Sequence, residues 1–290
     1  MTHQGHLKPR SLEEAISMLS EYGGNAKIFA GGTDLLVKMK KKVLLPEYLI
    51  NIQGIKELDS IVYDKTNGFR IGPMTPIFSL QNSSLIRDRF HALHQAAAVL
   101  GTPVIRRQAT IGGNLCNAAP SADTAPPLIV LGAVLKISEM EGGKTVPIEG
   151  FFTGPGTTCL EPGQMLTSIQ IPHPTPQTGS AYLKHTRTNG ADLAIVGVAA
   201  LVVMGDGFIE DIKIALGAVA PTPVRAKNAE EILKGKQPGI ELLNEAGKAA
   251  AIESIPIDDT RSSSDNRREI VSVMVRRAVK QAVDQINPEV

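Results

Sequence analysis

The first part of the chain combines helical and extended patterns of apolar residues. Ser11 and Glu14 form a capping box, and the apolar residues after it recur at helical spacing until a glycine pair, which predicts an opening helix. Residues 27–30 predict a short strand that ends at a second glycine pair. Residues 33–42 then predict another helix, with Thr33 as its N-cap.

The middle of the chain predicts several short strands and one longer helix. Short β-prone runs occur within residues 48–72, and a helical pattern opens after Thr75 and Pro76. A longer helix is predicted over residues 84–100. Further strands are expected within residues 134–171, where glycine and proline clusters separate them.

The last part of the chain has a different organisation. Residues 173–180 concentrate Pro, Thr, Gly and Ser and predict a linker between two domains. A buried strand is predicted over residues 193–203 and an alternating strand over residues 208–219, and three helical patterns follow. Strands followed by helices favour an α+β unit over an alternating parallel sheet.

Composition and charge narrow the classes of function. The 290 residues are 42% apolar. The chain has 30 basic and 29 acidic residues, which gives a formal net charge of +1. A sizeable core is therefore expected, without a global field that would attract nucleic acid or an anionic membrane. The longest apolar run, residues 193–204, is too short to span a bilayer, and the first residues show no apolar leader, so a cytoplasmic location is expected. Cys116 and Cys159 are the only cysteines, too few for an iron–sulfur or zinc site within this chain.

Two segments share one design, in which a glycine pair follows an extended run and precedes a small polar residue. They read AGGTDLL at residues 30–36 and TIGGNLCNAAPSAD at residues 110–123. Such segments are expected to expose consecutive backbone N–H groups, which bind anions beside a helix N-terminus, and two of them could grip a pyrophosphate. The alternative is that each pair only forms a tight turn. Neither segment fits a P-loop or the GxGxxG turn of a Rossmann fold.

These two segments, in this order and at this separation, resemble the FAD-binding medium subunit of the molybdenum hydroxylases, the xanthine dehydrogenase and carbon monoxide dehydrogenase family. The resemblance implies an α+β chain with a two-lobed FAD-binding domain of the vanillyl-alcohol-oxidase/MurB-like (PCMH) type over residues 1–175, with lobes of about 1–57 and 58–175. A small α+β C-terminal domain of the carbon monoxide dehydrogenase flavoprotein type, with a β-sheet and a helical bundle, is then implied for residues 176–290. There the segment YLKHTRTNGADLA, residues 182–194, resembles a recurrent Lys, Arg and Asp pattern of the family.

The family's FAD contacts carry over to positions of this sequence only through the resemblance. The two glycine segments would embrace the pyrophosphate, Asp123 would bond the adenosine ribose, Leu166 would contact the adenine portion and Lys184 would lie near the flavin. The implied cofactor-binding residues are Lys27, Ile28, Phe29, Ala30, Gly31, Gly32, Thr33, Asp34, Leu35, Ile105, Ala109, Thr110, Gly112, Gly113, Asn114, Ala118, Asp123, Leu166 and Lys184.

Structural alternatives to these roles stay open. Asp123 is also well placed to cap the helix that follows it, and Lys184 could be an ordinary surface lysine. Asp192 and Arg187 could form a structural ion pair.

Each of three further features can be interpreted either as functional or as purely structural. The run KMKKK, residues 38–42, could dock an acidic partner, but lysines at a helix end also complement the helix dipole. His91 and His94 have a spacing that two ligands of one metal could use, although no third ligand is evident, and no metal site is expected. Cys116 lies inside the second glycine segment, but a reactive thiol needs an activating group that the sequence does not provide.

The resemblance implies an electron-transfer subunit that holds FAD non-covalently. Electrons would come from a small 2Fe-2S subunit and pass to NAD⁺, a quinone or another acceptor. The molybdenum cofactor is expected only on a large partner subunit, and a dimer of heterotrimers is left open. No catalytic residue, nucleic-acid partner or integral membrane segment is expected. A self-contained FAD-dependent reductase or oxidase of the same fold and a flavin-free scaffold subunit are the alternatives.

Overall fold

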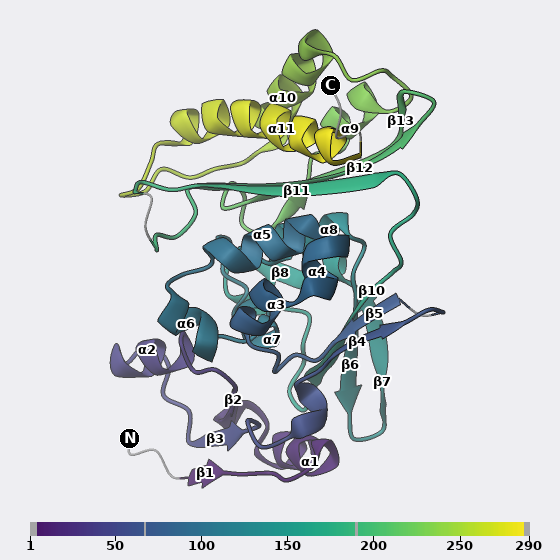
Figure 1. Cartoon of the computed structure of the whole chain (residues 1–290). Helices are drawn as coiled ribbons and strands as arrows, with labels where there is room; N and C mark the ends of the chain where they lie inside the picture. The colour runs from purple at the N-terminus through teal and green to yellow at the C-terminus, as the bar shows by residue number, and fades with distance from the viewer. Residues whose placement is uncertain (1–4, 67, 189–190, 287–290) are drawn as a thin grey trace.

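Three units are stacked along the molecule. The computed structural model describes residues 5–66, 68–188 and 191–286. Figure 1 shows an N-terminal lobe at the bottom, a central unit of helices beside a sheet, and a C-terminal unit at the top in which helices cover a long sheet. Residues 189 and 190 of the predicted Lys, Arg and Asp segment lie outside the described residues.

The N-terminal lobe is built on a three-stranded parallel sheet in the order β1-β3-β2. Its strands are β1 Gly5–Leu7, β2 Ala26–Phe29 and β3 Tyr48–Asn51. The predicted opening helix is confirmed as α1 Leu12–Tyr22, and the Ser11 hydroxyl accepts a hydrogen bond from the Glu14 amide at 3.2 Å. The helix packs Ala15 and Leu19 against Ile50 of the sheet.

The second predicted helix is present but begins later than expected. It is α2 Leu35–Lys40, and its N-cap is Asp34, whose side chain makes no capping hydrogen bond. The prediction that Thr33 caps this helix is therefore wrong. Without a capping side chain, the backbone amides at the start of the helix remain available to another acceptor.

The central unit contains a five-stranded antiparallel sheet in the order β4-β5-β10-β6-β7. Its strands are β4 Ile61–Asp64, β5 Gly68–Ile71, β6 Val134–Glu139, β7 Gly142–Pro147 and β10 Met165–Ile171. Five short helices share its hydrophobic core: α3 Ile77–Asn82, α4 Ser84–Arg89, α5 His91–Val99, α7 Ile111–Asn117 and α8 Ala125–Val130. A sixth, α6 Pro103–Gln108, contacts α3, and its one buried residue is Arg106. The small elements are a hairpin, β8 Phe152–Gly154 with β9 Thr157–Thr158, and the 3₁₀ turns Gly23–Asn25, Lys56–Leu58 and Ile148–Gly150.

The single helix predicted over residues 84–100 is two helices, so that prediction is wrong. The helix is interrupted at Phe90, whose φ of −136° and ψ of 60° are not helical. The break turns the Phe90 ring into the core, where it meets Phe69 edge to face with ring centroids 4.6 Å apart. Burying a phenylalanine stabilises by about 1.5–3 kcal/mol, which exceeds the helix propensity lost at one position.

The C-terminal unit contains a four-stranded antiparallel sheet in the order β11-β12-β13-β14. Its strands are β11 Thr178–His185, β12 Val196–Gly205, β13 Phe208–Gly217 and β14 Val224–Arg225, and its helices are α9 Lys227–Leu233, α10 Ile240–Glu253 and α11 Ser264–Ile286. The predicted order of strands followed by helices is confirmed.

The C-terminal sheet is covered on both faces. Helix α11 lies along one face, and α5 and α8 of the central unit contact the other (Figure 1). A strand between two layers of helices needs apolar side chains on both sides, which explains the unbroken apolar run of β12. None of the helices in the described ranges has the length and hydropathy to cross a bilayer.

Candidate functional site

The loop between β2 and α2 presents a run of unbonded backbone amides. From Gly31 to Leu35, none of the backbone N–H groups has an acceptor among the residues that the structure describes. Gly32 has a φ of +74°, a conformation that favours glycine. The sequence-based prediction of an exposed amide run is confirmed for this segment, and an oxyanion is the ligand such a run suits.

The same loop packs tightly against the end of α6. A Cβ on Gly31 would collide with the backbone carbonyl oxygen of Gln108 and lie 3.1 Å from the Cα of Ala109. A Cβ on Gly32 would lie 2.5 Å from the Phe29 ring. Glycine is thus required here by contacts within the protein, and the contact with Gln108 brings the two glycine segments together.

The second glycine segment forms a helix start and not an open turn. Thr110 is the N-cap of α7, and its hydroxyl accepts a hydrogen bond from the Gly113 amide at 3.1 Å. The Gly112 amide donates to the carbonyl of Pro73 at 2.8 Å. The prediction of exposed amides is therefore wrong for these two glycines, because the helix cap and the neighbouring chain already use them.

The two glycines of this segment have different surroundings. A Cβ on Gly112 would lie 2.7 Å from the carbonyl oxygen of Pro73, so packing excludes a side chain there. A Cβ on Gly113 would meet only the Thr110 hydroxyl, at 2.9 Å, within 4 Å. Gly113 therefore borders open space, into which a ligand can approach the backbone.

Side-chain hydrogen bonds hold the two segments in place. The Lys38 ammonium of α2 donates to the Asn117 amide oxygen of α7 at 2.6 Å. The Thr124 hydroxyl donates to the amide oxygen of Asn114 at 2.6 Å. The amide loop and the start of α7 thus form one connected surface.

A buried polar cluster joins the central unit to the C-terminal sheet. Asp123 precedes α8, and its carboxylate accepts hydrogen bonds from the Tyr182 hydroxyl at 2.8 Å and the Lys184 ammonium at 2.9 Å. The side chains of Lys184 and Asp123 are 5% and 6% exposed. The interpretations of Asp123 as a helix cap and of Lys184 as a surface lysine are both wrong, because α8 is capped by Thr124 without a side-chain bond and Lys184 is enclosed.

Electrostatics within this cluster follow from its burial. Burial raises the pKa of the Asp123 carboxyl, while the charge and hydrogen bond of Lys184 act in the opposite direction. Burial and the neighbouring Asp123 raise the pKa of Tyr182 well above its usual value, so the phenol stays a hydrogen-bond donor.

Sequence reasoning missed Tyr182, although a signal was present. Tyr182 and Lys184 are two positions apart on β11, and residues at that spacing point to the same face of a strand. Once Lys184 is a candidate site residue, Tyr182 can be identified as a second one, because it lies on the same face of the strand. Helix α5 also contributes to the polar cluster around Asp123, because the Lys184 ammonium donates a hydrogen bond to the Val99 carbonyl at the end of this helix, at 3.2 Å.

The model of the FAD binding domain in molybdopterin dehydrogenase matches residues 2–174. This chain belongs to the FAD-binding medium subunits of the molybdenum hydroxylases. The model of the CO dehydrogenase flavoprotein C-terminal domain matches residues 180–282.

Relatives cover nearly all of this medium subunit. It is 31% identical to the xanthine dehydrogenase FAD-binding subunit of Escherichia coli O157:H7 over 94% of both chains. It is 32% identical to the glyceraldehyde dehydrogenase medium chain of Sulfolobus acidocaldarius, over 95% of this chain and 97% of that one. A solved chain of the carbon monoxide dehydrogenase from Hydrogenophaga pseudoflava superposes with a TM-score of 0.93 at 34% identity and 97% coverage of each. The predicted fold class is confirmed.

The remaining predicted contact residues of the medium subunit have different surroundings, and Leu166 lies on β10 of the central sheet, paired with Ile137 of β6. Lys27 is exposed on the edge strand β2, next to the half-buried Ile28 and Phe29, and Ala30 and Leu35 flank the amide loop. Ile105 is exposed on α6. Ala109, Ala118 and Leu166 are buried in the core of the central unit.

Other candidates do not form sites. Asp192 accepts hydrogen bonds from Thr188, and the described residues contain no ion pair between Asp192 and Arg187. Burial, with Cys159 nearby, raises the pKa of Cys116 to about 12, so this thiol stays protonated at neutral pH. Over the described residues, no three His, Cys, Asp or Glu side chains cluster as a metal site would need.

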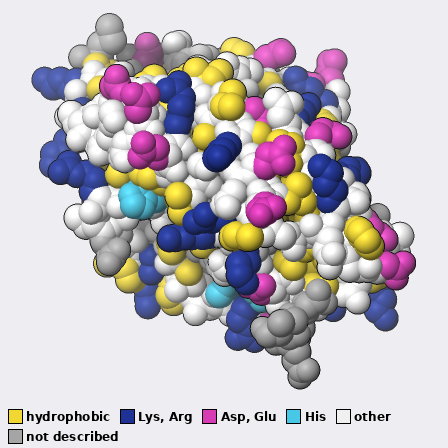
Figure 2. Space-filling view, turned by 90° about the horizontal axis from the view of Figure 1, so that it is seen from above, with side chains coloured by type: hydrophobic (Ala, Val, Ile, Leu, Met, Phe, Trp, Pro, Cys, Tyr) yellow, Lys and Arg dark blue, Asp and Glu magenta, His cyan; other side chains and the backbone are white. Residues whose placement is uncertain are grey.

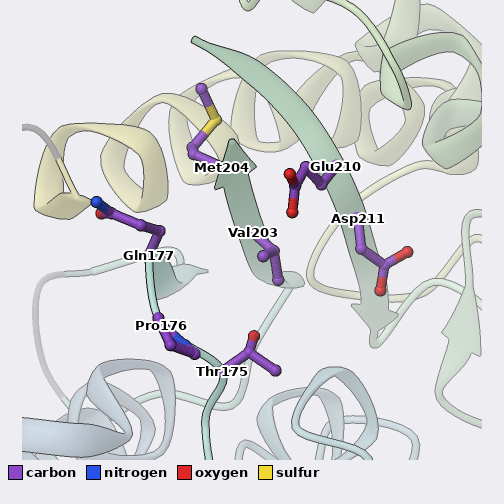
Figure 3. A pocket seen from close by; sticks show the side chains of 7 residues that line it. All are labelled: Thr175, Pro176, Gln177, Val203, Met204, Glu210 and Asp211. Atoms are coloured by element: carbon purple, nitrogen blue, oxygen red, sulfur yellow. The ribbon is translucent and has the colours of Figure 1, made fainter. Parts of the chain in front are cut away.

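A cavity of about 590 Å³ opens at the far end of the C-terminal sheet. Figure 3 shows its lining, with Glu210 and Asp211 from β13 and Met204 from β12 beside residues 175–177. Asp211 is paired with Lys234 at 2.9 Å. None of these lining residues belongs to the glycine segments or the Asp123 cluster, so the cavity is separate from the site described above.

Proposed function

We propose that this medium subunit is the electron-transfer component of a multisubunit dehydrogenase and holds FAD non-covalently. The amide run from Gly31 to Leu35 carries the proposal, because partial positive charges with no protein acceptor suit a pyrophosphate. FAD, when bound, supplies one- and two-electron transfer. The protein's own part is to bind it, orient it and exclude water.

The other predicted contacts fit the same ligand. The backbone at Gly113 borders open space beside Thr110, which supports an approach of the pyrophosphate from the second side. Each carboxylate oxygen has two lone pairs, so Asp123 keeps acceptor capacity for a ribose hydroxyl although Tyr182 and Lys184 already donate to it. The buried charge of Lys184 suits a position near the flavin.

The proposal includes partners. Relatives are named as medium chains or FAD-binding subunits of dehydrogenases for different substrates, which supports substrate chemistry on another chain. We place the molybdenum cofactor on a large subunit and the 2Fe-2S clusters on a small one, with NAD⁺, a quinone or another acceptor receiving the electrons. A dimer of heterotrimers, a cytoplasmic location and a domain boundary at residue 175 belong to the same proposal.

A visible absorption spectrum of the purified chain, with and without added FAD, tests the proposal. Bound flavin that denaturation releases is the expected result. Gly113→Val should weaken FAD binding at least about tenfold, because the side chain enters the open space beside the backbone. Gly239→Val is the matched control, since nothing lies within 4 Å of a Cβ there and its φ of −133° suits valine. A chain that ignores FAD, or a Gly113 variant with full affinity, would refute the assignment.

A further inference from the structure

Helix α2 has few of the contacts that normally hold a helix in place. It has six residues, and none of them is buried. Leu36 and Val37 are each 49% exposed, and no side chain of α2 belongs to a hydrophobic cluster of the described residues. Figure 1 shows this helix at the edge of the molecule. Most helical stability in proteins comes from the packing of an apolar face, so α2 must be held by another kind of contact.

One side-chain hydrogen bond joins α2 to another element. The Lys38 ammonium donates to the Asn117 amide oxygen at 2.6 Å, and the bond is partly buried. Within the ranges that the structure describes, no other side chain of α2 forms a hydrogen bond or an ion pair. A hydrogen bond from a charged donor is about twice as strong as a neutral one. The Lys38–Asn117 bond is therefore the main side-chain contact that holds α2.

This bond connects the helices that follow the two glycine segments. Lys38 lies less than one helical turn after Leu35, where the amide loop ends. Asn117 is the last residue of α7, whose N-cap is Thr110. The Leu36 amide donates to the Gly32 carbonyl inside the amide loop, so a movement of α2 would displace the loop as well.

Other contacts of the loop hold only its beginning. Gly31 packs against the Gln108 carbonyl, and the Gln53 side chain donates to the Ala30 carbonyl at 2.7 Å. Both contacts lie at the strand end of the loop. The amides nearest α2 depend on the position of that helix.

We infer that Lys38 is a positioning residue for the cofactor pyrophosphate, because through Asn117 it holds the amide loop in its binding conformation before the ligand arrives. The inference rests on the proposed function. The apparent affinity of a site is its intrinsic affinity multiplied by the fraction of molecules in the competent conformation, so a loop that is formed in advance binds more tightly. Loss of the Lys38–Asn117 bond lowers that fraction.

Hydrogen exchange of the ligand-free chain, followed by mass spectrometry, tests the inference without FAD. The amides of Leu36, Lys41 and Val43 are hydrogen-bonded in and just after α2, so their protection reports whether the helix is formed. Lys38→Met keeps much of the side-chain volume and should speed exchange at these amides about tenfold or more. Lys38→Arg keeps a charged donor and should restore most of the protection.

Two variants are matched controls. Lys40→Met removes the other lysine in the last turn of α2, so it loses a similar helix-dipole interaction but no side-chain hydrogen bond. Lys280→Met removes a lysine of α11 that pairs with Asp284 at 2.9 Å but is 65% exposed. Figure 2 shows the outer face of the C-terminal unit, where basic and acidic side chains are interspersed. Both variants should leave exchange within about threefold of wild type.

Titration with FAD, followed by flavin fluorescence, gives a second readout. Lys38→Met should weaken FAD binding about threefold or more, but by no more than the factor by which it speeds exchange, because a loss of preformed loop cannot exceed the change in the opening equilibrium. Lys38→Arg should bind FAD almost as wild type does.

Several results would overturn the inference. They are a wild-type α2 without protection, equal effects of Lys38→Met and Lys40→Met, and a Lys38→Met variant with full FAD affinity. A loss of FAD affinity larger than the increase in exchange would indicate direct contact of Lys38 with the cofactor and would also overturn the positioning role. A wild-type chain that does not bind FAD would refute the proposed function, while exchange in the ligand-free chain would still decide whether Lys38 holds the loop.

Discussion

Replacing Lys184 by methionine should destabilise the protein through the carboxylate it leaves behind. The Lys184 ammonium lies 2.9 Å from the Asp123 carboxylate, and both side chains are almost fully enclosed. Methionine keeps much of the aliphatic volume of lysine but removes the charge. Asp123 would then be a buried carboxylate whose remaining strong donor is Tyr182.

The expected loss is large because the pair is buried. Breaking a buried ion pair by removing one partner costs about 3–5 kcal/mol, whereas an exposed pair is worth only about 0–1 kcal/mol. Three kcal/mol corresponds to roughly a hundredfold change in the ratio of folded to unfolded protein. Changing Asp123→Asn in the same chain removes the unpaired charge, so the double variant should recover more than half of the loss.

The sign of the pH dependence follows from the burial of Asp123. Burial already raises the pKa of this carboxyl in the folded protein, and loss of Lys184 raises it further above its unfolded value of about 3.9. A carboxyl whose pKa rises on folding favours the native state below the unfolded pKa, and this advantage disappears as the pH rises through the folded pKa. The Lys184→Met variant should therefore be least destabilised near pH 4 and most destabilised near pH 8.

Urea unfolding followed by far-UV circular dichroism at several pH values measures both effects. Lys248→Met, on an exposed face of α10, is the control and should change the free energy of unfolding by less than about 0.5 kcal/mol. A loss below about 1 kcal/mol for Lys184→Met, or a double variant as unstable as the single one, would show that the pair is not a coupled buried unit.

Three further changes test other parts of the structure. Lys42→Gly should raise the free energy of unfolding by about 0.5–1 kcal/mol in thermal melts, because glycine adopts a φ of +57° without strain; a lower melting temperature would contradict this. Phe90→Ala should cost about 3–5 kcal/mol, since the ring is fully buried, and a loss under 1 kcal/mol in urea titrations would disprove its core role. At Asp259, burial acts to raise the pKa, but hydrogen bonds from Arg261 and Arg267 lower it well below the usual value. The stability this provides is present above about pH 4 and lost below it, so Asp259→Asn should flatten the acid limb of the stability profile, and an unchanged limb would refute the assignment.

The sequence predicts most of the elements whose signals are local. The N-cap at Ser11 and the apolar run of β12 are signalled within their own segments, and the structure contains both, although the Glu14 carboxylate accepts from the Arg10 amide and not from that of Ser11 as a full capping box requires. The helix break at Phe90 has no local signal. It depends on a pocket beside Phe69, which is distant in the sequence.

In the candidate site too, some features have a local sequence signal and others depend on residues that are distant in the sequence. The glycine pair at Gly31 is visible in the sequence, but its packing partner, Gln108, belongs to another helix. The use of the Gly113 amide by Thr110 follows from the helical conformation of that segment, which two adjacent glycines do not suggest. Tyr182 was recoverable from its spacing to Lys184, whereas the burial of Lys184 depends on the C-terminal sheet docking on α5.

The contact between Gly31 and the Gln108 carbonyl also bears on the order in which the chain is assembled. It joins segments about 80 residues apart, so closing this loop costs entropy that only later tertiary contacts offset. Contacts of such high sequence separation slow folding. The amide loop therefore acquires its final shape only after α6, which ends at Gln108, has been synthesised and packed, so a finished cofactor loop requires the chain at least as far as α6 and not the N-terminal lobe alone.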